Sequence, residues 1–155
     1  STGTIVDYDG RESRANMQPS INSVWFAKMK NSIKHLYLNK EMQPIISSCI
    51  LSTGFCGLQC NEISFEYIAS YVSNAYFEIH KDMLAHGATQ EAVNNDDLAG
   101  VHIIIPEDTV LCAYHETTQA IYAQISKNVC ENQELVKLRD WLLPMLMNGQ
   151  ATISD

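Results

Sequence analysis

Most of the basic side chains of this 155-residue chain lie in one short segment. Residues 11 to 40 contain six Lys or Arg and one acidic residue, although the whole chain has a formal net charge of −8. Lys and Arg neutralise phosphates, while Arg and Asn can also form paired hydrogen bonds with base edges in the major groove. The segment is therefore a candidate DNA-binding surface, although basic clusters are also typical of hairpins that contact only solvent. Its candidate residues are Arg11, Arg14, Asn16, Lys28, Lys30, Asn31 and Lys34.

A small polar loop provides a second candidate surface. It contains His86, Gly87, Thr89 and Gln90. Glycine allows a backbone to approach a ligand closely, and Thr and Gln offer compact donors and acceptors for phosphates or bases. Gln90 is the preferred contact residue. The alternative is a loop that is held together by its own hydrogen bonds.

The cysteines and histidines suggest a thiol or metal site only weakly. The five cysteines are odd in number and unevenly spaced, which indicates reduced, mostly buried thiols in a cytoplasmic protein. Cys56 with Cys60, and Cys112 with His115, lack the paired Cys-x-x-Cys spacing of zinc sites. We therefore expect no metal and no cofactor, and a small thiol or metal enzyme stays a third-ranked alternative.

Two further classes of protein lack their sequence signatures. The chain has neither the phosphate-binding loop of nucleoside triphosphatases nor the glycine-rich turn of dinucleotide-binding proteins. It also has no 18-residue apolar run and no basic-apolar N-terminal signal, so we expect a soluble, unexported protein that does not meet a membrane.

The remaining charge is strongly acidic. Residues 41 to 155 contain four basic and fifteen acidic side chains. An acidic body disfavours a polyanionic partner at long range, but a basic stripe on that body can still bind one. The acidic total also supports an alternative function, a protein interaction module that never meets DNA.

Apolar runs predict a mixed α/β or α+β domain in the first hundred residues. Two runs, 24–29 and 33–38, flank Lys30-Asn31-Ser32 and predict a β-hairpin with its charge at the tip. A third run, 45–51, is a candidate strand before the turn residues Gly54 and Gly57. One amphipathic helix is expected over 65–79 with Ser64 as its N-cap, and a last strand over 101–105.

The segment from Glu107 to Gln150 predicts one helix of roughly 35 to 40 residues, about 55 Å long. A domain of this size cannot cover such a helix, so part of it should project and pair as a coiled coil with another helix. The expected seam has a polar middle and consists of Tyr114, Thr118, Ile121, Ile125, Asn128, Asn132, Leu135, Arg139, Leu142 and Leu146.

The end of this helix resembles a conserved helical region in the specificity subunits of type I restriction-modification enzymes. The similar run is Glu131-Asn-Gln-Glu-Leu-Val-Lys-Leu-Arg-Asp-Trp-Leu-Leu-Pro-Met-Leu-Met-Asn-Gly-Gln150. Its order of Glu-Asn, Leu-Arg-Asp, Leu-Leu-Pro and Leu-Met-x-Gly is long and compositionally unusual.

The front of the chain resembles the target-recognition domains of the same family. The similar stretches are Ser13–Met17, Trp25–Asn31, Gly87–Gln90, Asp97-Leu98 and Ile103–Pro106. After Pro106, however, family members usually have a second proline and a Glu-Gln pair, where this chain has Glu107-Asp-Thr-Val-Leu. A complete specificity subunit also has two recognition domains and two long helices, so we expect a fragment or truncated form without the front of its recognition domain.

The resemblance implies a non-catalytic, cytoplasmic protein with a recognition domain over 1–106, a spacer helix over 107–150 and a tail over 151–155. It implies double-stranded DNA, modification subunits and, through them, restriction subunits as partners, with a homodimer through the helix as a further possibility. Leu135, Leu138, Trp141 and Leu142 are the side chains expected to face a partner helix or subunit. The resemblance also favours DNA binding over the solvent-exposed alternative at the basic segment, while for the loop from His86 to Gln90 it leaves DNA contact and a self-contained loop evenly balanced.

Overall fold

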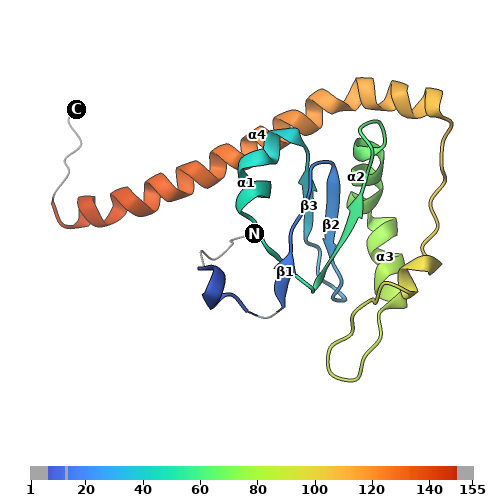
Figure 1. Ribbon diagram of the computed structural model, residues 1–155, viewed down its shortest axis with the longest axis horizontal. Coiled ribbons are helices and arrows are strands. Elements are labelled where there is room, and N and C mark those ends of the chain that lie inside the picture. Colours follow the sequence, from blue (N-terminus) through green and yellow to red (C-terminus); the bar gives the residue numbers. More distant parts are fainter. Residues whose placement is uncertain (1–6, 13, 150–155) are drawn as a thin grey trace.

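The computed structural model describes residues 7–12 and 14–149 (Figure 1). It has a mixed α/β architecture, with two small antiparallel sheets and short helices followed by one long helix. In chain order, with η for a 3-10 helix, the elements are η1 (Tyr8–Gly10), β1 (Ala15–Met17), β2 (Ser23–Ala27), β3 (His35–Leu38), η2 (Lys40–Met42), α1 (Gln43–Ser48), β4 (Leu51–Ser52), β5 (Phe55–Gln59), α2 (Phe65–Ser73), α3 (Ala75–Leu84), η3 (Asp97–Gly100) and α4 (Asp108–Met147).

Strand β2 is the centre of the larger sheet, in which the strand order is β3-β2-β5. All five of its residues are buried, because its two faces pack against different clusters. Val24 and Phe26 face a core built with α2 and α3, whereas Trp25 faces a second core that includes Leu38 and Met42. The predicted hairpin is confirmed, with Val24 opposite Tyr37 and Phe26 opposite His35.

Two predicted elements adopt other structures. The third apolar run is mostly the helix α1, since Pro44 lies in its first turn, where a missing N–H costs nothing. The predicted helix 65–79 is divided at Asn74, whose extended backbone ends α2 and whose side chain accepts a hydrogen bond from the Tyr76 N–H at 2.8 Å. Ser64 does occupy the N-cap position of α2, but its side chain makes no capping hydrogen bond.

The predicted strand over 101–105 is wrong. The segment is extended and alternates between half-buried and exposed residues as far as Ile104, but it pairs with no strand among the described residues. Two tyrosine hydroxyls of α2 bind its carbonyl groups instead, from Tyr71 to His102 at 2.9 Å and from Tyr67 to Ile104 at 2.6 Å. An apolar β-branched run therefore specified extended backbone here, but not a sheet.

Helix α4 has 40 residues and crosses the globular part before it extends beyond it (Figure 1). Its first half is held against α2 by the His115–Glu66 pair at 2.8 Å and by hydrogen bonds between the Ser70 hydroxyl and the hydroxyls of Tyr114 and Tyr122. Cys130, near Met42, is the last α4 residue with a described side-chain contact to the globular part. The predicted long, projecting helix is confirmed, and no helix in residues 7–12 and 14–149 is long and apolar enough to cross a bilayer.

Gly57 is required by the close approach of β5 to Trp25. A Cβ at this position would lie 2.6 Å from the indole ring. We expect Gly57→Ala to lower the free energy of unfolding by about 1–3 kcal/mol, because the buried ring has no room to move. Urea denaturation would measure the change. Gly54→Ala is the matched control, since its Cβ would meet only the Ser52 hydroxyl at 3.5 Å; equal losses in the two variants would contradict this explanation.

Candidate nucleic-acid interface

The two candidate surfaces, more than fifty residues apart in the sequence, lie against each other. The β2–β3 connection, residues 28–34, is hydrogen-bonded to the segment 86–93, which follows α3. The Lys30 N–H donates to the Glu91 carbonyl at 3.0 Å, and the Val93 N–H donates to the Lys28 carbonyl at 3.0 Å. Met29 also forms an isolated β-bridge with Ala92. We call residues 28–34 the hairpin tip and residues 86–93 the flanking segment.

Two residues with positive φ shape this junction. The tip contains a β-turn in which the Ser32 N–H donates to the Met29 carbonyl at 3.3 Å and Asn31 has a φ of 60°. Asn tolerates this left-handed conformation better than most residues. In the flanking segment Gly87 has a φ of 141°, and a Cβ there would collide with the Gln90 carbonyl. The Gly87 loop is therefore tightly folded, and Thr89 and Gln90 are exposed at its end.

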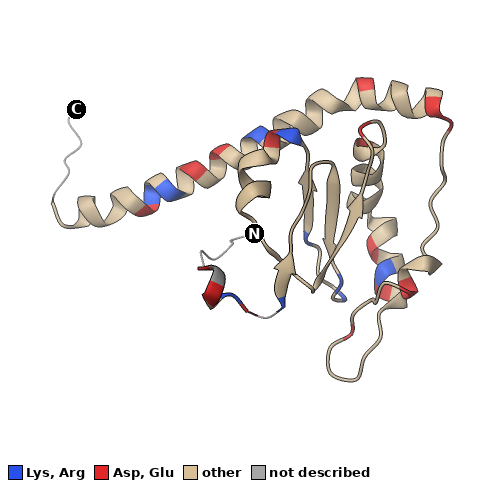
Figure 2. Ribbon diagram, viewed as in Figure 1, with Lys and Arg blue, Asp and Glu red and all other residues tan. Residues whose placement is uncertain are grey.

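The β4–β5 turn connects the first basic residues to the hairpin tip. The Thr53 N–H donates to the Arg14 carbonyl at 2.9 Å, and the Lys28 N–H donates to the Gly54 carbonyl at 2.9 Å. Asn16 lies exposed on β1, two residues from Arg14. Figure 2 shows basic positions at the lower end of β1 and along the β2–β3 connection. Arg11 lies just after η1.

Carboxylates reduce the positive charge of this surface. Glu91 binds the Lys30 ammonium at 2.7 Å, and this hydrogen bond is the main cause of the raised pKa of Lys30. His86 lies 3.3 Å from a carboxylate oxygen of Asp97. Lys34 is exposed and Lys28 is half-buried. Sequence reasoning missed Glu91, because nothing in its local pattern indicates that it meets a lysine sixty-one residues earlier.

The cysteines lie at half-buried or exposed positions. Four of the five cysteines are half-buried and Cys112 is exposed, so the thiols are less buried than expected from the sequence. Burial raises the pKa of Cys60 to about 11, which disfavours the thiolate needed by a nucleophile. His115 is bonded to Glu66, and no three metal-ligating side chains among the described residues could hold an ion together.

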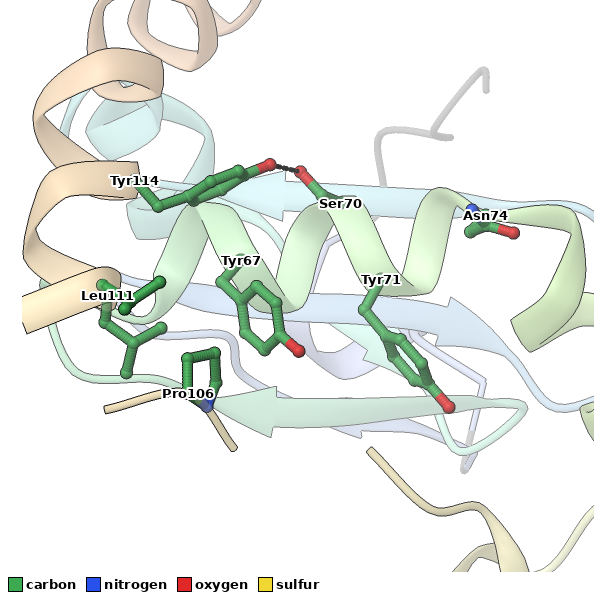
Figure 3. A pocket seen from close by; sticks show the side chains of 8 residues that line it. Tyr67, Ser70, Tyr71, Asn74, Pro106, Leu111 and Tyr114 are labelled. Atoms are coloured by element: carbon green, nitrogen blue, oxygen red, sulfur yellow. Dashed lines mark hydrogen bonds between the residues drawn. The ribbon is translucent and has the colours of Figure 1, made fainter. Parts of the chain in front are cut away.

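A pocket of about 280 Å³ lies where the start of α4 packs against α2 (Figure 3). Tyr67, Tyr71, Ser70 and Tyr114 line it together with Asn74, Pro106, Val110 and Leu111. Its tyrosine hydroxyls all have partners: Tyr67 and Tyr71 bind the carbonyls of the 101–107 segment, and Tyr114 binds Ser70 at 2.7 Å. Such satisfied hydroxyls hold the start of α4 on the domain and leave few polar groups for a ligand.

The projecting half of α4 exposes apolar side chains. Leu135, Leu138 and Trp141 are 54%, 49% and 61% exposed, and Leu142 is half-buried. Ile121 and Ile125 are exposed as well, because the helix packs on the domain through a neighbouring stripe. That stripe comprises Leu111, Tyr114, His115, Thr118, Tyr122, Ser126 and Cys130.

Part of this chain is similar in sequence to two curated proteins. Over 70 residues, or 45% of this chain, it is 29% identical to the type I restriction enzyme HindI specificity subunit of Haemophilus influenzae. Over 69 residues, or 44% of the chain, it is 30% identical to the type I restriction enzyme MjaIX specificity subunit of Methanocaldococcus jannaschii. This chain is partly similar to type I restriction enzyme specificity subunits.

The matched segments make up 15% and 16% of these two specificity subunits, so the similarity covers a small part of each. No protein-family profile matches the chain. No solved structure matches it either.

Proposed function

We propose that the chain recognises a DNA target as part of a type I restriction-modification specificity subunit. The observation that supports this most is the contact between the hairpin tip and the flanking segment. Both segments were candidates on independent grounds, and backbone hydrogen bonds hold them side by side. The residues that we assign to this surface are Lys28, Lys30, Asn31, Lys34, His86, Thr89 and Gln90. Arg14, just before β1, and Asn16, on β1, extend it, and Arg11 lies earlier in the chain, just after η1.

In this proposal lysines and arginines hold phosphates, and Asn31, Asn16 and Gln90 offer groups that can pair with base edges. In the free protein the Glu91 carboxylate is ion-paired with the Lys30 ammonium group, so a DNA phosphate would have to replace Glu91 as its partner. The protein has no catalytic role of its own. Methyl transfer and cleavage belong to the modification and restriction subunits that it directs to the target in the cytoplasm.

Helix α4 would serve as the spacer and docking element. We divide the chain into a recognition domain over 1–106, the helix over 107–150 and a tail over 151–155. The exposed Leu135, Leu138 and Trp141, with Leu142, would meet a partner helix, a modification subunit or a second copy. Exposed apolar side chains on an unaccompanied helix need such a partner to be covered.

A second candidate function is a protein interaction module that associates through α4 without binding DNA. The net charge of −8 and the exposed apolar residues of α4 favour it. The two functions differ in the role of the hairpin tip, which the interaction module does not use.

Charge reversal at the hairpin tip separates these two functions. We expect Lys28→Glu with Lys30→Glu to weaken binding to duplex DNA and to reduce the salt slope by about one per lost phosphate contact, because each lysine releases counterions. Fluorescence anisotropy over a series of salt concentrations would measure both. Lys127→Glu with Lys137→Glu, on α4, makes the same charge change away from the tip. If the chain is an interaction module that does not bind DNA, the tip variant and this control should show the same DNA affinity and the same salt slope.

Removal of the Glu91 charge should strengthen DNA binding. In Glu91→Gln the Lys30 ammonium loses its carboxylate partner and becomes available to phosphate, so we expect a gain of up to about fivefold in affinity, the range of an exposed ion pair. The same anisotropy titration measures it. Glu116→Gln, at an exposed position on α4, controls for the change in net charge; an unchanged or lower affinity in Glu91→Gln would count against a role for Lys30.

Leu138→Asp and Leu142→Asp should weaken assembly through α4 while the globular part stays folded. A charge in an apolar helix interface loses the burial energy and adds a desolvation cost. Sedimentation velocity, with and without the modification subunit, would measure assembly, and circular dichroism would verify folding. Met83→Asp, at an exposed apolar position on α3, is the control. If assembly survives both leucine changes, these positions do not form the docking surface.

A further inference from the structure

Three polar side chains of α3 contact the hairpin tip and the first residue of β3. Glu78 binds His35 of β3 at 2.7 Å, Lys81 donates to the Ser32 carbonyl at 3.1 Å, and both carboxylate oxygens of Asp82 lie 3.2 Å from the Asn31 N–H. These residues are more than forty positions away from their partners in the sequence. None of them was a candidate from sequence patterns.

The buried part of this network is fully paired. Lys81 is completely inaccessible, and its ammonium group also binds Glu78 at 2.6 Å and lies 3.7 Å from Asp82. A buried ammonium group without such partners would be strongly destabilising, so its geometry is closely constrained. Lys81 therefore sets the position of α3, and with it the position of Asp82, relative to the Ser32 carbonyl.

Asp82 accepts a hydrogen bond from the backbone of Asn31, the residue of the tip with an unfavourable backbone conformation. Asn31 has a φ of 60°, a conformation that costs free energy for residues other than glycine, and its N–H would otherwise have to be satisfied by water. The Asp82 side chain is 24% exposed, so it is accessible to solvent but still directed at this amide. A hydrogen bond from a backbone N–H to a carboxylate is stronger than one between neutral groups.

We propose that Asp82 is a positioning residue for DNA recognition: it holds the Asn31 turn in the conformation in which Lys30 and Asn31 contact DNA. This inference rests on the proposed DNA-binding function. The charge of Asp82 alone suggests the opposite effect on DNA binding, because a carboxylate beside a DNA-binding surface repels phosphate. On electrostatics alone, removal of the Asp82 charge should increase affinity.

Two substitutions that remove the same charge separate positioning from repulsion. Asp82→Asn keeps an oxygen that can accept the Asn31 N–H, whereas Asp82→Ala removes the acceptor. Positioning predicts that Asp82→Ala binds duplex DNA about fivefold or more weakly than Asp82→Asn at the same salt concentration, as expected for the loss of a hydrogen bond that orders the tip. It also predicts faster hydrogen exchange at the Asn31 amide in Asp82→Ala than in wild type, with Asp82→Asn close to wild type.

The experiment uses the full chain, random-sequence duplex DNA and anisotropy titrations, with circular dichroism to verify that both variants fold. Equal affinities in the two variants, while the wild type binds DNA, would overturn the positioning role and leave the proposed function intact. A wild-type chain that binds no DNA at low salt, with or without the modification subunit, would overturn both. Unchanged exchange at Asn31 in Asp82→Ala would also contradict the inference.

Discussion

The burial of β2 on both faces is the constraint on which the rest of the structure depends. Five consecutive buried residues leave this strand no solvent side, so one core must form with α2 and α3 and another with η2, α1 and β4. Trp25 fills the second core closely enough to exclude a side chain at its cross-strand neighbour, Gly57. Both edges of β2 are paired, and only its ends are free to carry polar residues.

This arrangement explains where the candidate interface lies. Once β2 ends at Ala27, the chain leaves the core, and polar residues can occupy the connection to β3. Helix α3 packs against the same core next to this connection. Its residues Lys81 and Asp82 therefore bind the backbone of the connection at Ser32 and Asn31. The segment after α3 then passes beside the tip and pairs with it. The same core also positions α2. Glu66 and Ser70 of α2 bind the first half of α4, and the second half of α4 projects beyond the domain.

Sequence patterns predicted those elements whose signals are local. The hairpin has apolar runs on both sides of turn residues, and α4 has a long stretch without glycine or proline, so both were expected. Apolar periodicity does not reveal three other features. The start of α1 depends on Pro44, the break before α3 depends on the Asn74 cap, and the course of the 101–107 segment depends on tyrosines from α2. Likewise, both halves of the candidate interface carried local signals, but their contact, the Glu91–Lys30 pair and the support from Asp82 are tertiary. The partial similarity to specificity subunits agrees with the family that the motifs indicated.

The most direct test of the central claim, that the hairpin tip and the flanking segment form one DNA-facing surface, is a titration of the isotope-labelled chain with duplex DNA followed by backbone amide chemical shifts. The account predicts that amides of the hairpin tip, 28–34, and of the flanking segment, 86–93, shift together, with one common affinity that weakens as salt increases. Amides in the projecting half of α4 should stay unchanged. Shifts confined to α4, or shifts in only one of the two segments, would contradict it.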